Sequence, residues 1–325
     1  MQDATQHSPT LSSNGTEKRS PQFVHLRCHS EFSIVDGIVR IDNYVLQANQ
    51  DAMPALALTD LSNLFGAIKF YKAARGNGIK PIIGCDVWLE NSQNRDQAHR
   101  ALLLVQNHAG YLQLCALISR AYLENQYRGR AELKPEWLKG LNGQSSNDKS
   151  TDGLILISGN AQSDIGAALI AGNIALAEKL AKQWSNAFPS RLYIELQRVH
   201  APTENLAPEK LMQQESLIHH ALDLASTLDL PVLATHPIQF ITADDFMAHE
   251  ARTCISEGYM LADSRRPKNF TPEQYFKTQA QMCDLFADIP EALANTVELA
   301  KRCNLTIELG KNYLPNFPKI GRAHV

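Results

Sequence analysis

The sequence lacks the cysteine spacing and the long apolar runs that would place it in several protein classes. Its six cysteines lie far apart and form no Cys-x-x-Cys pair, which excludes a zinc ribbon and a disulfide framework. No apolar run approaches the roughly 20 residues that a membrane-spanning helix needs, and the first residues lack the apolar core of a signal peptide. We therefore expect a cytoplasmic protein without membrane contacts.

An excess of positive charge is also absent. The 325 residues include 31 Lys and Arg against 34 Asp and Glu, a formal net charge of -3. A surface that wraps DNA phosphates is normally strongly basic. If DNA is a partner, we expect that these 325 residues do not form its main binding surface. The 44% hydrophobic content suffices for one large core or two modest ones.

Short apolar runs alternate with helical patterns from Phe23 onward, after a polar stretch at 1–21 that we expect to be a disordered tail. Strands are predicted at 23–29, 54–59, 79–89, 101–105, 153–158, 191–196 and 230–235. This alternation favours a parallel sheet that closes into an α/β barrel over residues 22–270. The polar stretch 124–150 predicts an exposed loop, and residues 271–319 predict a mainly helical connection to another domain.

Charged side chains gather at the predicted C-terminal ends of the first strands, where α/β barrels place their chemistry. Arg27 and His29 end the first strand, Asp60 and Asp86 follow at the ends of the next two, and Asp36 lies on the first loop. A histidine with several carboxylates from separate strands is what a divalent-metal phosphoesterase needs to polarise a phosphate and generate hydroxide.

The arrangement of these residues leaves simpler interpretations open. Strand alternation places His25, Arg27 and His29 on one face of the first strand. Asp60, however, could simply cap the helix that follows it. The basic cluster at 264–268 is more typical of a solvated loop than of a phosphate site, because it is short.

Six sequence blocks stand in a fixed order along the chain. They are FVHLRCHSEFSIVDG at 23–37, MPALALTD at 53–60, NLFGAIKFY at 63–71, GIKPIIG at 78–84, FADIPEALANTVELAKRCN at 286–304 and YLPNF at 313–317. Together they resemble the start of the alpha subunits of bacterial DNA polymerase III, a module called the PHP (polymerase and histidinol phosphatase) domain. The resemblance implies an α/β fold, a distorted seven-stranded (β/α) barrel of the PHP type, followed by a mainly helical connection toward a polymerase palm.

The resemblance also implies where a metal site would stand, and most of its positions carry other side chains here. Non-ligands at these positions are Arg27, Leu61, Arg100, Pro237 and Gln239, whereas His29, Asp36, Asp60 and Asp86 are retained. A guanidinium group brings a fixed positive charge and can bind a carboxylate bidentately. We therefore predict a vestigial, metal-free pocket held by Arg–Asp pairing, made of Arg27, His29, Asp36, Asp60, Asp86 and Arg100.

The resemblance implies one function for the full-length protein and a different role for the part given by this sequence. The full-length protein would be a replicative DNA-directed DNA polymerase, a nucleotidyltransferase with Mg²⁺ in its palm site. The present part would hold no catalytic residue and no cofactor. It would support the palm and dock the proofreading exonuclease subunit within the replicase, while DNA binds mainly through modules absent here.

Two alternatives remain at this level. One is a stand-alone PHP-type metal-dependent phosphoesterase, which intact ligand pairs would have favoured. The other is a non-catalytic adaptor that ends near residue 319. Residues 320–325 match the translation of a sequencing adapter, so we expect them to be a non-native tail.

Overall fold

The computed structural model describes residues 22–139, 151–199 and 208–311. The predicted tail at 1–21 and the predicted non-native residues 320–325 lie outside these ranges. Within them, no helix is both long enough and apolar enough to cross a membrane.

Six strands and the extended segment 23–30 form a closed ring of backbone pairing. The strands are β1 (Ala55–Leu58), β2 (Lys80–Leu89), β3 (His99–Val105), β6 (Leu154–Ser158), β7 (Leu192–Gln197) and β8 (Val232–Thr235). The segment closes the ring on both sides. The His25 carbonyl accepts from the Ala57 amide of β1 at 3.0 Å, and the His29 amide donates to the Ile238 carbonyl, just after β8, at 3.0 Å. The predicted distorted seven-stranded α/β barrel is therefore confirmed.

The ring is mixed, which corrects the prediction of a parallel sheet. β3 runs antiparallel to both β2 and β6, whereas β1 with β2, β6 with β7 and β7 with β8 are parallel. A parallel partner needs a crossover of a dozen or more residues, usually with a helix. Only a short connection with the 3-10 turn η1 (Arg95–Gln97) joins β2 to β3, so β3 returns antiparallel.

The polar stretch 124–150 is not simply a loop, which is a second correction. Its described part contains β4 (Gln126–Tyr127), β5 (Arg130–Leu133) and α4 (Pro135–Lys139), and β5 extends the sheet beside the end of β2. Arg130 lies 4.9 Å from the ring centre of Trp88, and Arg95 lies 4.8 Å from that of Tyr127. Cation–π stacking therefore orders a segment whose polarity alone predicts a loop.

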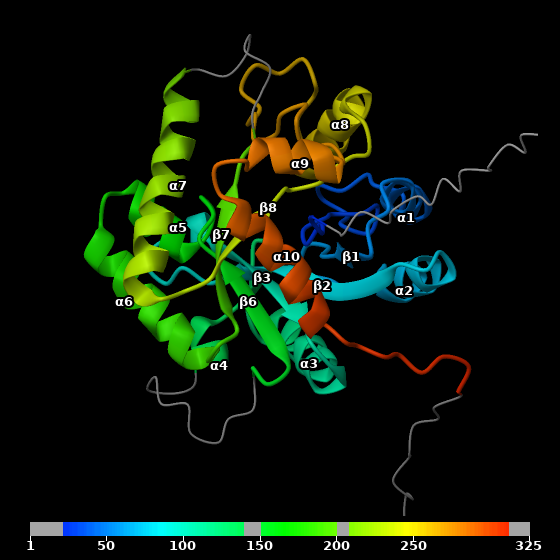
Figure 1. Ribbon diagram of the computed structural model, residues 1–325. Helices are drawn as coiled ribbons and strands as arrows, with labels where there is room; N and C mark the ends of the chain where they lie inside the picture. Colours follow the sequence, from blue (N-terminus) through cyan, green and yellow to red (C-terminus); the bar gives the residue numbers. More distant parts are fainter. Residues whose placement is uncertain (1–21, 140–150, 200–207, 312–325) are drawn as a thin grey trace, which may run out of the picture.

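Helices cover the outside of the ring (Figure 1). They are α1 (Ile41–Gln50), α2 (Ala67–Gly76), α3 (His108–Glu124), α5 (Asp164–Ile170), α6 (Ile174–Ala187), α7 (Pro208–Leu228), α8 (Phe246–Glu257, preceded by η3, Ala243–Asp245) and α9 (Gln279–Leu285). A further helix, α10 (Pro290–Arg302), lies at one end of the ring. Asn107, Ser163 and Asn173 each begin one of these helices by accepting a hydrogen bond from a first-turn amide. The outward strand residues pack against the helices, among them Leu56, Ile83, Leu103, Leu156 and Ile194.

The inside of the ring holds a second apolar cluster. Because strand side chains alternate between the two faces, the residues between the outward ones point into the barrel. They include Leu26, Ala57, Ile82, Leu102, Ile157, Tyr193 and Leu233. Further along the same inward faces of β2, β3 and β7, polar residues replace the apolar ones. Charged side chains therefore fill this part of the barrel.

Helix α10 lies against one end of this inner cluster. Its Leu299 and Ala300 belong to the cluster, and Thr296 Oγ1 accepts a hydrogen bond from the Val24 amide at 3.0 Å. Asn295 donates to the Val232 carbonyl at 2.8 Å. We therefore propose that the barrel domain extends through α10, beyond the limit at residue 270 that the sequence pattern predicts.

Candidate functional site

A bulge in the extended segment 23–30 sets which of its side chains enter the barrel. The Ala57 amide donates to the His25 carbonyl, and the Thr59 amide, just after β1, donates to the Cys28 carbonyl. A step of two residues from Ala57 therefore matches a step of three in the segment. Such an extra residue changes the face of every side chain beyond it. Leu26 therefore packs in the inner cluster and Arg27 also points inward.

His25 consequently lies apart from Arg27 and His29, which corrects the prediction that the three share a face. Its ring centre lies 4.8 Å from those of both Phe23 and Phe276, and its Nε2 lies 2.6 Å from the Lys277 carbonyl. Burial lowers the pKa of His25 to about 4. His25 is thus a neutral core histidine.

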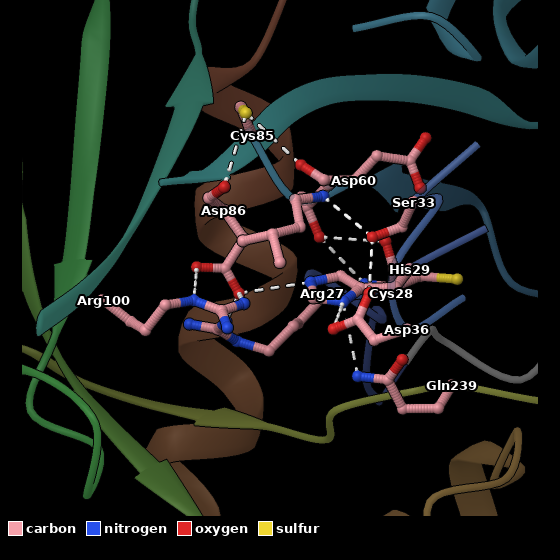
Figure 2. A network of polar contacts seen from close by, with 12 residues as sticks. Arg27, Cys28, His29, Ser33, Asp36, Asp60, Cys85, Asp86, Arg100 and Gln239 are labelled. Atoms are coloured by element: carbon pink, nitrogen blue, oxygen red, sulfur yellow. Dashed lines mark hydrogen bonds and ion pairs between the residues drawn. The ribbon is translucent and has the colours of Figure 1, made fainter. Parts of the chain in front are cut away.

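Asp86 of β2 is the centre of a buried network of charges (Figure 2). Arg100 of β3 donates from Nε to Oδ1 at 3.1 Å and from Nη2 to Oδ2 at 2.5 Å, and Arg27 Nη1 also donates to Oδ2. His29 Nε2 lies 3.2 Å from the same oxygen. Burial would raise the pKa of Asp86, but Arg100 and Arg27 hold it far below its usual range.

Glu195 of β7 is a second anchor of this network, and the sequence prediction missed it. Arg27 donates to both of its carboxylate oxygens, from Nε at 2.9 Å and from Nη2 at 3.0 Å. Asn160 and Thr235 donate to it at 2.6 and 2.5 Å. No motif marks Glu195, but it stands inside an apolar strand, and a carboxylate in such a strand is rarely buried unless it is paired.

His29 joins the first loop to this network. Its Nδ1 lies 2.9 Å from Asp36 Oδ2, and the side-chain amide of Gln239 lies 3.3 Å from the same ring atom. Burial alone would lower the pKa of His29, but Asp36 and Asp86 raise it to about 9. His29 is therefore a cation at neutral pH, paired with a carboxylate on each side.

Asp60 stands apart from the arginines. Its two oxygens accept from the Ser30 amide at 2.6 Å and from the Ser30 hydroxyl at 3.0 Å. Burial raises the pKa of Asp60 to about 6. It thus orders the start of the first loop, a role different both from arginine pairing and from the helix cap that the sequence left open.

The charges of the network balance without a metal ion. Its cations are Arg27, Arg100 and His29, and its anions are Asp36, Asp86 and Glu195. Across the described residues, no group of three or more His, Cys, Asp or Glu side chains is arranged to hold a metal. These donors therefore do not fit a divalent metal ion, because guanidinium groups occupy the carboxylate oxygens of Asp86 and Glu195.

An open pocket of about 740 Å³ adjoins the network. Residues of α5, α7, α8 and the segment 266–274 line it. Arg266 and Lys268, from the basic cluster that predicts a solvated loop, belong to this lining, and Arg266 pairs with Glu250 of α8. Arg265 fits the prediction, since its side chain is 84% exposed and pairs with Asp263.

The fold and this site define a class. A family model described as "PHP domain" matches residues 25–199. The chain belongs to the PHP domain family.

Curated relatives narrow the comparison to one kind of protein. DNA polymerase III subunit alpha of Vibrio cholerae is 44% identical over 303 residues, which is 93% of this chain and 24% of the relative. The same subunit of Neisseria meningitidis is 46% identical over 299 residues (92% and 25%), and that of Escherichia coli K12 is 43% identical over 298 residues (92% and 24%). The chain spans about a quarter of the length of these relatives and aligns with their N-terminal region.

Among solved structures, an amidohydrolase from Chromobacterium violaceum, described with bound SO4 and no metal, covers 70% of this chain and 96% of its own. Its sequence identity is 16% and its TM-score is 0.42.

Proposed function

We propose that this chain is the N-terminal PHP portion of a replicative DNA polymerase alpha subunit and that it acts there as a metal-free scaffold. The network around Asp86 carries this proposal, because two arginines and a histidine supply the positive charge that metal ions would otherwise bring. The relatives, all called DNA polymerase III subunit alpha, support the assignment to a polymerase.

In the full-length protein the reaction would be templated nucleotidyl transfer, with Mg²⁺ in a palm site outside this chain. The barrel would support the palm and dock the proofreading exonuclease subunit and other replicase subunits in the cytoplasm. The carboxylates of Asp86 and Glu195 are paired with guanidinium groups, which supports the scaffold role over a stand-alone metal-dependent phosphoesterase.

Docking is tested with the 325-residue chain and the proofreading exonuclease subunit encoded in the same genome. We expect a one-to-one complex by size-exclusion chromatography with light scattering at micromolar concentrations. Separate elution of the two proteins would refute the docking role.

The expectation that this chain has no catalytic activity of its own is tested with phosphatase and exonuclease assays in the presence of Mn²⁺. We expect no activity above that of a His29→Ala variant, which controls for contaminating enzymes. Activity that the wild-type chain shows and this variant loses would instead establish the phosphoesterase.

A further inference from the structure

We propose that His25 and His236 form an acid-sensitive latch that holds the segment 272–277 against the barrel. In their neutral form the two side chains bind the main chain of this segment, and uptake of protons releases it. The segment contributes Pro272 and Gln274 to the wall of the 740 Å³ pocket, so its release would open that pocket. The latch is a property of the barrel itself and does not depend on the scaffold role proposed above.

One nitrogen of each imidazole binds the main chain of the segment. His25 Nε2 lies 2.6 Å from the Lys277 carbonyl oxygen. His236 Nε2 lies 3.1 Å from the Tyr275 carbonyl oxygen. A carbonyl oxygen can only accept a hydrogen bond, so each Nε2 carries a proton and donates it. Two histidines from opposite sides of the ring closure therefore attach the same short segment.

The main chain of the segment has few other long-range hydrogen bonds. The Gln274 carbonyl accepts from the Gln239 amide at 2.9 Å, and the Phe276 amide donates to the Ile241 carbonyl at 3.3 Å. The buried ring of Phe276 lies 4.8 Å from that of His25, so its packing also depends on the position of this imidazole. Loss of both imidazole bonds would therefore weaken the attachment of the segment strongly.

The second nitrogen of each imidazole has no acceptor for a further proton. His25 and His236 are completely buried, and neither Nδ1 has a hydrogen-bond partner among the described residues. A protonated imidazole carries an N–H donor on both nitrogens and needs an acceptor for each. The fold provides one acceptor for each ring. It therefore accommodates the neutral form, whereas the cation would be buried with an unsatisfied donor.

The charges around the two rings also oppose protonation. The ring centres of His25 and His236 lie 6.4 Å apart, so a proton on one makes a proton on the other less favourable. Lys277 adds positive charge beside both rings, and its Nζ is paired with Glu273 at 2.8 Å. Among the described residues, the histidine that pairs with carboxylates is His29 and neither member of the latch. Burial and these charges lower the pKa of His25 to about 4 and that of His236 to about 3.

Acidification should therefore release the segment while the strands of the ring stay paired. A histidine in the released segment regains a pKa of about 6.5, so the released form binds protons more tightly than the attached form. The latch is complete above pH 6.5 and is lost as pH falls toward 4. In this range each histidine changes the release equilibrium up to about tenfold per pH unit, and the effects of the two multiply. From pH 6 to pH 5 the released population should rise on the order of 50-fold.

The experiment follows hydrogen exchange of the Phe276 amide by NMR on the 325-residue chain from pH 7 to pH 4.5. After correction for the intrinsic pH dependence of exchange, we expect its protection to fall about 50-fold from pH 6 to pH 5. Amides of β3, which is paired on both sides, should stay protected. His25→Gln and His236→Gln should each reduce the change to about sevenfold, because a glutamine amide donates to the same carbonyl but takes up no proton. The matched control His219→Gln, on the exposed side of α7, should keep the wild-type response.

Titration of the two imidazoles by NMR in the wild-type chain tests the latch even if a variant does not fold. We expect both rings to stay neutral at pH 5 for as long as the Phe276 amide is protected. A ring that titrates near pH 6.5 while this amide stays protected would overturn the inference. So would loss of protection that runs parallel in Phe276 and β3, or a wild-type pH response in the double variant His25→Gln and His236→Gln.

Discussion

Asp86 illustrates how one residue can decide between a metal site and a salt-bridge core. A buried carboxylate is unfavourable unless positive charge and hydrogen bonds compensate for the lost water. Here that compensation comes from Arg27, Arg100 and His29, all of which are nearly inaccessible to solvent. Removing any one of these three side chains would therefore leave buried charge that is no longer balanced.

Replacement of Arg27 by methionine should test this interdependence. Arg27→Met removes one cationic partner of Asp86 and the only guanidinium described beside Glu195, and breaking buried pairs in this way costs about 3–5 kcal/mol. Arg128→Met is the matched control, because Arg128 is 74% exposed and its pair with Asp96 contributes about 0–1 kcal/mol. Urea unfolding measures both losses, and similar values for the two variants would contradict the account.

His29 makes the stability depend on pH on the alkaline side. Its pKa is about 9 in the folded chain against 6.5 unfolded, so the folded chain holds this proton more tightly. The contribution of His29 is complete below pH 6.5 and is lost as pH rises through 9, a change of about 3 kcal/mol.

The measurement is the free energy of unfolding at pH 6 and pH 9.5, compared with that of a His29→Gln variant. We expect the wild type to lose stability over this interval and the variant to lose much less. The exposed His219 provides a control, since His219→Gln should keep the wild-type dependence. A His29→Gln profile parallel to the wild type would show that His29 is not the titrating group.

At the scale of elements, the position of α10 has the largest consequence. The helix lies beyond the family-model match, yet its apolar face lies in the inner cluster and its side chains bond Val24 and Val232. A helix that packs in this way stabilises the ring directly.

Leu299→Ala should therefore behave as a core substitution. Leu299 is completely buried, and a Leu→Ala change at such a position costs about 2–5 kcal/mol. Glu298→Ala, next to it on the exposed face, should change stability by less than about 1 kcal/mol. Thermal or urea unfolding distinguishes the two cases. A negligible effect of Leu299→Ala would show that α10 is only a connection, as the sequence pattern suggests.

The elements also show which physical signals the sequence carries. Apolar runs predict the strands well, because buried strands need them on both faces of a barrel. The direction of β3 follows instead from the length of one connection, and the face of His25 from a single extra residue in segment 23–30. Hydrophobic periodicity does not report either feature.

The sequence likewise predicts some residues of the site and misses others. Arg27, Arg100 and Asp86 could be placed together because the family resemblance implies that their positions belong to one site. Glu195 has no such marker and is recognised only by its buried contacts. The sequence groups Asp60 with the other carboxylates at the strand ends. In the structure, however, its two oxygens accept hydrogen bonds from Ser30 and do not pair with an arginine.

At the scale of the whole molecule, the modest charge has a structural explanation. The net charge of -3 coexists with a core in which three cations face three anions. These charged groups therefore neutralise one another inside the barrel. This use of charge agrees with the scaffold role that we propose.

Elemental analysis of the purified chain tests the central claim, a PHP barrel held by ion pairs in place of metal, most directly. After expression in zinc- and manganese-supplemented medium, we predict well below one metal ion per chain by inductively coupled plasma mass spectrometry. Stoichiometric zinc or manganese that is lost in an Asp86→Asn variant would contradict the account.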